Sequence, residues 1–126
     1  MTLIQQSELL GNGKEGIKGS YQVITDADDW TALKDKMNSV NAQGFKMDPV
    51  DFSTEIVIAL FSDLQGSGGH SIEINDIIQK KDKIIVQVKK TSPSGRATSM
   101  MTQPYYIVKL PQTKKEIKFE TSQASH

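Results

Sequence analysis

The sequence feature that most constrains the fold is the run Ile56–Phe61, IVIALF, which contains no polar side chain. Half of its residues are β-branched, and β-branched side chains favour strands over helices. A run this short is also typical of a strand, because helices usually extend over more residues. A strand with one face in water would alternate with polar residues, so we predict a strand that is buried on both faces.

A glycine-rich stretch follows this run. Residues 66–69 contain three glycines, and residues 70–74 then alternate between apolar and polar, which predicts a strand with one buried face. We therefore predict a β-hairpin with a glycine-rich tip. Two interpretations of the glycines stay open: they let another surface approach the backbone closely, or they form a β-bulge that bends the sheet.

One helix is predicted, beginning after Thr25 or Asp26, whose side chains are suitable N-caps. Asp28 and Asp29 then lie in the first turn, where the helix dipole favours negative charge. The apolar residues that follow recur at helical spacing and form one stripe: Trp30, Leu33, Met37 and Val40. Docking of this helix onto the sheet is the interpretation that we prefer for Trp30, and a platform for a ligand is the alternative.

The remaining apolar segments predict further short strands, at residues 21–24, 84–89, 105–110 and 116–119, and residues 2–10 are expected to be extended. Nearly all connections are too short for a crossover helix, and the exception is the helix-bearing connection from Ile24 to Glu55. We therefore predict an α+β fold, a mostly antiparallel β-sheet of about six or seven strands with one helix packed on it. Residues 1–126 are expected to form a single domain, with a core at about residues 20–120.

The core of this domain is predicted from the inward positions of the strands. We expect these side chains to be buried against Trp30, Leu33 and Met37 of the helix, since one face of each strand must turn away from water. The predicted buried residues are Ile56, Ile58, Leu60, Ile72, Ile74, Val86, Val88 and Val108.

Composition excludes several classes of function. Lysine plus arginine and aspartate plus glutamate number 15 each, so no net charge attracts nucleic acid or an anionic membrane. Cysteine is absent, which excludes disulfides, thiolate metal sites and a thiol nucleophile. No apolar stretch approaches the roughly 20 residues of a membrane span. His70 is the only histidine within the expected fold, so we expect no metal site and no cofactor.

Serine hydrolase chemistry is a further hypothesis, because Asp63, Ser67, His70 and Ser71 lie close in the sequence. Neighbouring residues on a strand point to opposite faces, so His70 and Ser71 are not expected to form a nucleophile–base hydrogen bond. The G-x-S-x-G motif, which presents a serine beside an oxyanion hole, is also absent. We therefore predict a protein without catalytic residues.

Three short motifs follow one another along the chain. The first is Asp51-Phe52-Ser53, and the second is Gly66-x-Gly68-Gly69-His70-x-Ile72-x-Ile74. The third is Thr102-Gln103-Pro104-Tyr105-x-Ile107-Val108-Lys109-x-Pro111. Their order and spacing resemble the PrcB family of protease complex subunits, and Trp30 matches a tryptophan of that family's early helix. The resemblance extends from about Tyr21 to Phe119.

This resemblance implies a non-catalytic protein that is exported or lipid-anchored and that helps to assemble or stabilise a surface protease. We therefore expect a protein partner, such as a protease, and a location outside the cytoplasm, in the periplasm or cell envelope. Residues 1–6 lack the pattern of a signal peptide, so a lipoprotein signal would have to have been removed. The oligomeric state stays open.

The chain departs from the family pattern at three positions. Relatives commonly carry threonine and tyrosine around the double glycine, where this chain has Ser67 and His70. Tyr106 stands where relatives often have histidine. If these positions touch a partner, its identity is expected to differ.

The predicted partner-binding surface combines two loops. Arginine and methionine adapt to a partner's surface and are frequent at interfaces, although methionine also fills gaps in cores. The predicted residues are Gly66, Ser67, Gly68, Gly69, His70, Arg96, Met100 and Met101. The alternative function is a small-molecule or glycan-binding domain that uses Trp30 or the tyrosines, and an enzyme is a third hypothesis.

Overall fold

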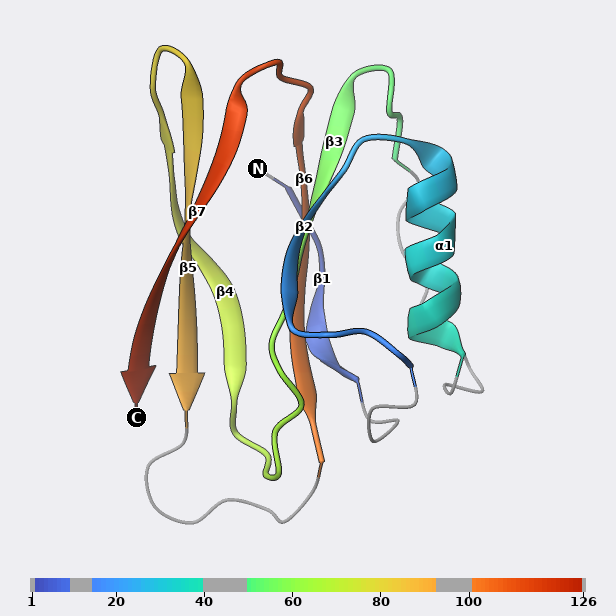
Figure 1. Ribbon diagram of the computed structural model, residues 1–126, viewed down its shortest axis with the longest axis vertical. Coiled ribbons are helices and arrows are strands. Elements are labelled where there is room, and N and C mark those ends of the chain that lie inside the picture. The colour runs from blue at the N-terminus through green and yellow to red at the C-terminus, as the bar shows by residue number, and fades with distance from the viewer. Residues whose placement is uncertain (1, 10–14, 40–49, 93–100, 126) are drawn as a thin grey trace.

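The computed structural model describes residues 2–9, 15–39, 50–92 and 101–125 (Figure 1). These residues form seven strands and one helix, an α+β fold as predicted. In chain order the elements are β1 (Thr2–Leu9), β2 (Ser20–Ile24), α1 (Ala27–Asn38), β3 (Glu55–Phe61), β4 (Ser71–Gln79), β5 (Lys83–Ser92), β6 (Gln103–Pro111) and β7 (Glu116–Ser125).

The strands form two sheets, and the molecule has three layers. The first sheet has the strand order β1-β6-β3-β2 and is antiparallel throughout. The second sheet has the order β4-β5-β7, and its β5–β7 pair is parallel. Helix α1 covers one face of the first sheet and the second sheet covers the other (Figure 1).

Strand β3 is buried on both faces, as its uninterrupted apolar run predicts. Ile56, Ile58 and Leu60 pack against the second sheet. Val57, Ala59 and Phe61 point the other way, into the cluster beneath α1. Because β3 lies inside the first sheet and between the helix and the second sheet, the positions from Ile56 to Phe61 are all apolar, and only Glu55 at its start is polar.

The predicted core residues are all buried, but the prediction that they pack against the helix is wrong. The eight residues belong to the cluster between the two sheets, whereas Trp30, Leu33 and Met37 belong to the cluster on the opposite face of the first sheet. Strand side chains alternate between faces, so even and odd positions of β3 must contact different layers.

The predicted hairpin between β3 and β4 is also wrong. Both edges of β3 are occupied, by β2 and β6, so β4 pairs with β5 in the second sheet. The glycine-rich stretch therefore carries the chain from one sheet to the other. The alternating pattern of β4 predicts one buried face correctly, but it contains no information about which strand is the neighbour.

Helix α1 begins where the sequence predicts. The Oδ1 atom of Asp26 accepts a hydrogen bond of 2.8 Å from the backbone N–H of Asp29, as an N-cap does. Trp30 is only 3% exposed, which confirms its role as an anchor of the helix on the sheet. Val40, predicted to continue the apolar stripe, lies outside the described residues.

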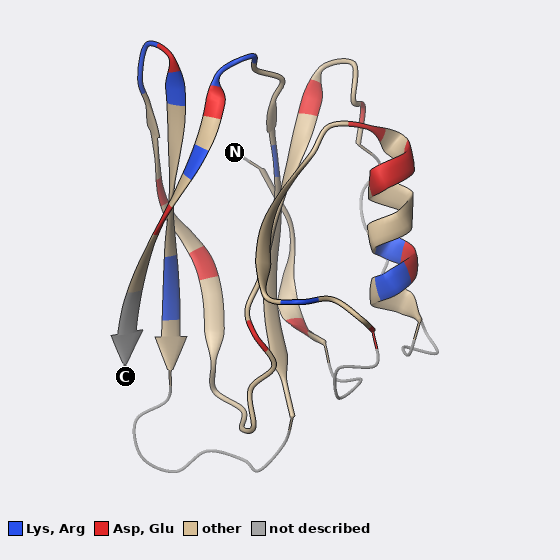
Figure 2. Cartoon of the chain, viewed as in Figure 1, with Lys and Arg blue, Asp and Glu red and all other residues tan. Residues whose placement is uncertain are grey.

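Charged residues lie mainly at strand ends and on outer faces (Figure 2). Lys109 of β6 and Glu55 of β3 form an ion pair of 3.6 Å, and the side chains of both are partly exposed. A pair at this exposure contributes little to stability. The fold is therefore held chiefly by its two apolar clusters.

Candidate protein-binding site

The glycine-rich segment, residues 65–70, is attached to the start of β6. Gln65 and Thr102 form an isolated antiparallel bridge, in which the N–H of Gln65 donates to the carbonyl oxygen of Thr102 at 2.7 Å. The N–H of Thr102 returns a bond of 2.9 Å to the carbonyl oxygen of Gln65. The Oγ1 hydroxyl of Thr102 donates a third bond, of 2.8 Å, to the carbonyl oxygen of Ser67. The segment is therefore held in one position.

Gln103 ties this region to the chain before β2. Its side chain is 1% exposed, and its Nε2 atom donates to the carbonyl oxygens of Ile17, at 2.7 Å, and Ser62, at 3.0 Å. The N–H of Ser62 donates to the carbonyl oxygen of Pro104 at 2.9 Å. These bonds join three segments that are far apart in the sequence, so the base of the glycine-rich segment is rigid.

The three glycines of the segment differ in what the structure requires of them. Gly69 has a φ of +84°, a left-handed conformation that side-chain-bearing residues rarely adopt. Gly68 is buried. Gly66 is exposed, and a Cβ atom placed on it would meet nothing within 4 Å. Gly69 is therefore needed to turn the chain, whereas Gly66 leaves the surface open.

His70 makes a hydrogen bond that the sequence did not predict. Its Nε2 atom lies 3.1 Å from the Oγ atom of Ser67, across the turn at Gly69. The partner that we considered from the sequence was Ser71. A catalytic histidine also needs a group that orients its second ring nitrogen. Among the described residues, none hydrogen-bonds that nitrogen. The Ser67–His70 pair thus closes the turn.

A cavity of about 240 Å³ lies beside His70, between β1 and the start of β4. Glu8 and Tyr105 contribute to its lining. Burial raises the pKa of the Tyr105 phenol to about 12, so this side chain stays protonated and neutral at physiological pH. The cavity offers hydrogen-bonding groups but no grouping of acids: nowhere in the described ranges do three His, Asp or Glu side chains gather closely enough to hold a metal ion.

Two exposed apolar side chains flank the Gln65–Thr102 bridge. Met101 precedes Thr102 and is 39% exposed, so the interpretation that it fills a gap in the core is wrong. Leu64 precedes Gln65 and is 38% exposed. Leu64 is not among the residues predicted from the sequence. A single apolar residue just beyond a buried strand does, however, indicate an exposed apolar side chain. We call Leu64, Gly66, Ser67 and Met101 the bridge surface.

The structure brings only part of the predicted binding surface together. The hydrogen bond from Thr102 to Ser67 places Met101 next to the glycine-rich segment, so residues 66–70 and Met101 share one region. Arg96 and Met100 lie outside the described residues.

Helix α1, the helix of the described chain, is not long enough to cross a membrane.

The PrcB C-terminal family matches residues 56–111 of the chain. The match runs from β3 to β6 and contains the bridge surface. It confirms the family resemblance over this segment, and it is shorter than the resemblance predicted from the sequence, because Trp30 and the Asp51-Phe52-Ser53 motif precede it. No curated protein and no solved structure matches the chain.

Proposed function

We propose that this protein is a non-catalytic binding module that assists or stabilises a partner protease or another protein of the cell envelope, and that it acts outside the cytoplasm. The match to the PrcB C-terminal family supports a domain like that of a protease complex subunit. The bridge surface is the part of the module that we assign to the partner.

The observation that carries this proposal is the pair of exposed apolar side chains on a rigid support. Leu64 and Met101 are 38% and 39% exposed on either side of a bridge that two backbone hydrogen bonds close. Because the backbone that carries these side chains is already ordered, a partner that covers them does not also have to order a loop. Gly66 adds a point where the partner's backbone can approach closely.

The alternative is a small-molecule or glycan-binding domain that uses aromatic side chains. Most of these side chains are buried and cannot contact a ligand. Trp30 is 3% exposed, Tyr105 is 0% exposed and Tyr106 is 8% exposed. A ring that stacks on a sugar must present a face to solvent, and these rings are packed in the core.

The proposal is tested by replacing residues of the bridge surface. The immobilised protein is used to capture partners from a native envelope extract, and a captured protease is then purified and titrated against each variant. Gly66→Glu and Met101→Glu should each weaken binding at least about tenfold, since each places an unpaired charge in the interface. Thr31→Glu, which adds the same charge on the exposed face of α1 outside the bridge surface, is the control and should bind normally. Affinity unchanged in both glutamate variants, or the capture of no protease and no other envelope protein, contradicts the proposal.

The location is tested separately, by fractionating cells that produce the native gene product. We expect it with the envelope or periplasmic fraction. Recovery with the cytoplasmic fraction would contradict an extracytoplasmic role even if the bridge surface binds a protein.

A further inference from the structure

Strand β2 is an outer strand of the first sheet, and no strand among the described residues pairs with its free edge. Its sequence, Ser20–Ile24, contains no charged residue and no proline, which are the usual devices that stop an edge from pairing with another chain. Its one strand partner among the described residues is β3. Alternate residues of β2 therefore point their backbone N–H and C=O groups outward, where no described strand forms hydrogen bonds with them.

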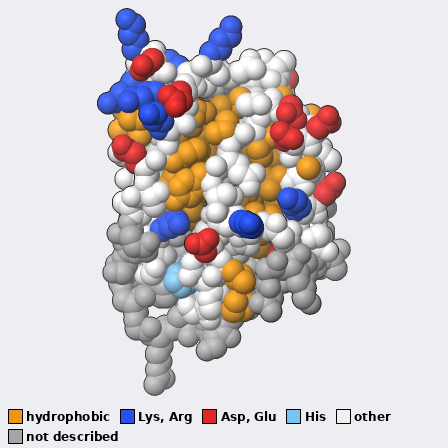
Figure 3. Space-filling view, in the orientation of Figure 1, with side chains coloured by type: hydrophobic (Ala, Val, Ile, Leu, Met, Phe, Trp, Pro, Cys, Tyr) orange, Lys and Arg blue, Asp and Glu red, His pale blue; other side chains and the backbone are white. Residues whose placement is uncertain are grey.

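The other outer strands differ from β2. Strand β4, at one edge of the second sheet, carries Glu73 and Asp76, and its register with β5 shifts between Ile74 and Asp76. Strand β7, at the edge of the second sheet, carries Glu116, Lys118 and Glu120 at exposed positions (Figure 2). Strand β1 is irregular, since its register with β6 shifts between Leu3 and Gln5. Figure 3 shows hydrophobic side chains gathered in the middle of the face that β2 and β7 present. Val23 of β2 is 39% exposed.

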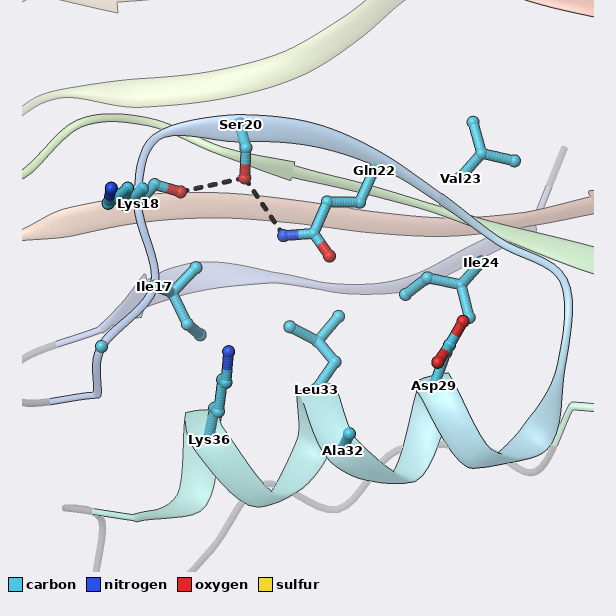
Figure 4. Close-up of a pocket in the computed structure, with 11 residues that line it drawn as sticks. Ile17, Lys18, Ser20, Gln22, Val23, Ile24, Asp29, Ala32, Leu33 and Lys36 are labelled. Atoms are coloured by element: carbon cyan, nitrogen blue, oxygen red, sulfur yellow. Dashed lines mark hydrogen bonds between the residues drawn. The ribbon is translucent and has the colours of Figure 1, made fainter.

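A cavity of about 470 Å³ lies between β2 and α1 (Figure 4). Ile17, Ile24 and Leu33 form its apolar part, and Gln22 points into it from β2. The Nε2 atom of Gln22 donates to Ser20 Oγ at 3.1 Å, and that hydroxyl donates to the carbonyl oxygen of Lys18 at 2.9 Å. The polar wall is therefore held by its own hydrogen bonds. On the apolar side Ile24 and Leu33 are 4% and 6% exposed, and Ile17 is half-buried.

The two ends of this cavity carry opposite charges. Lys18 and Lys36 lie at one end, and Asp29 lies at the other (Figure 4). None of these three side chains takes part in an ion pair with another described residue. The charge of Asp26, followed by burial and the charge of Asp28, raises the pKa of the Asp29 carboxyl, so a cation placed there would relieve repulsion.

We propose that β2 and this cavity bind an extended segment of a partner protein, which pairs with the backbone of Ser20–Ile24 as an added strand. The segment places a large apolar side chain in the cavity, an acidic residue beside Lys18 and Lys36, and a basic residue beside Asp29. This surface is separate from the bridge surface, and the inference holds whether or not the partner of that surface is a protease.

A second copy of this chain fits the cavity less well than such a segment. If β2 of a second copy paired with β2, its residues facing the cavity would be Ser20, Gln22 and Ile24. Two of these are polar and already bonded to each other, so Ile24 alone would add an apolar contact in the cavity. A segment with leucine or phenylalanine at alternate positions adds more apolar contact there.

The probe is a library of random heptapeptides displayed on phage and selected on the immobilised full chain. We expect enriched peptides with apolar residues at alternate positions and with opposite charges at their two ends. Ala32→Trp, which fills the cavity from an exposed helix position, should weaken the binding of a selected peptide at least about tenfold. Thr31→Trp is the matched control, because Thr31 is also exposed but does not line the cavity, and it should bind normally.

Two further arms test the mode of binding. N-methylation of alternate peptide amides should abolish binding, because it removes the hydrogen bonds to the edge strand. The double variant Lys18→Glu and Lys36→Glu should weaken binding about two- to fivefold, and a peptide whose acidic residue is replaced by lysine should recover it. Peptides that bind Ala32→Trp as well as the unchanged chain, or no enrichment at all, overturn the proposal. If the NMR amide shifts of β2 change with protein concentration in the absence of peptide, β2 pairs with a second copy of the chain, and the proposal is wrong.

Discussion

The Oγ1 hydroxyl of Thr102 donates a hydrogen bond of 2.8 Å to the carbonyl oxygen of Ser67, 35 residues earlier in the chain. Thr102 is 0% exposed, so water cannot replace this bond. It holds the glycine-rich segment against the start of β6 and thereby places Ser67 and Met101 on one surface. Local sequence patterns do not predict such a contact, because each partner lies outside a regular strand or at its end.

Replacement of Thr102 by valine is expected to loosen the bridge surface. The substitution keeps the shape of the side chain and removes its only donor, so the free energy of unfolding should fall by about 1 kcal/mol. Urea unfolding measures this loss, and the exchange rate of the Gln65 amide should rise at the same time. Thr31→Val, on the exposed face of α1, is the control. Equal stability of the two variants would show that the hydroxyl contributes nothing.

Leu60→Ala tests the core between the two sheets. Leu60 is 0% exposed and packs against the second sheet, so its truncation leaves a cavity and should cost about 2–5 kcal/mol. Leu64→Ala removes the same atoms from a side chain that is 38% exposed and should change stability by no more than about 0.5 kcal/mol. Chemical denaturation of both variants measures the difference. A loss for Leu60 in the range expected for Leu64 would contradict the position of β3.

A pair of glycines distinguishes close packing from open space. A Cβ atom on Gly19 would lie against the carboxylate of Asp63 and 2.9 Å from its backbone nitrogen, so Gly19→Ala should destabilise the protein by about 1–3 kcal/mol. Gly66→Ala has open space around it and should be neutral within about 0.5 kcal/mol. Thermal melts of the two variants make the comparison. If Gly66→Ala is the more damaging, the described position of the glycine-rich segment is wrong.

The buried phenol of Tyr105 predicts a loss of stability at high pH. Burial raises its pKa from the usual 10.0 to about 12, so the unfolded chain releases this proton at a lower pH than the folded one. Its contribution is complete below about pH 10 and is lost as the pH rises to about 12, a change of about 1–2 kcal/mol because solvent screens part of the effect.

Urea unfolding at several pH values across this interval measures that loss. The Tyr105→Phe variant should lose less stability over the same interval, because its ring stays packed near Phe61 and carries no ionisable group. Identical pH profiles for the two proteins would contradict the assignment. Burial also raises the pKa of Tyr106, so part of the dependence should remain in the variant.

Several parts of this structure follow from patterns within short stretches of the sequence. The apolar run at residues 56–61 predicts β3 and its burial on both faces, and Asp26 with the stripe from Trp30 predicts α1. These patterns work because they reflect the environment of each residue and the local hydrogen bonds of its own backbone. Of the predicted binding surface, residues 66–70 and Met101 lie in one region, and their role in binding stays a prediction.

Other parts were decided only when the strands assembled. β3 and β4 lie in different sheets, and β5 pairs in parallel with β7. The sequence does not predict these pairings, because every strand carries the same backbone donors and acceptors and an alternating pattern does not indicate which strand is the neighbour. The same assembly buries Ile58 between the sheets and Val57 under the helix, exposes Leu64 beside the bridge, and leaves β2 at an open edge. Such features depend on which layers meet, and that is a property of the packed chain.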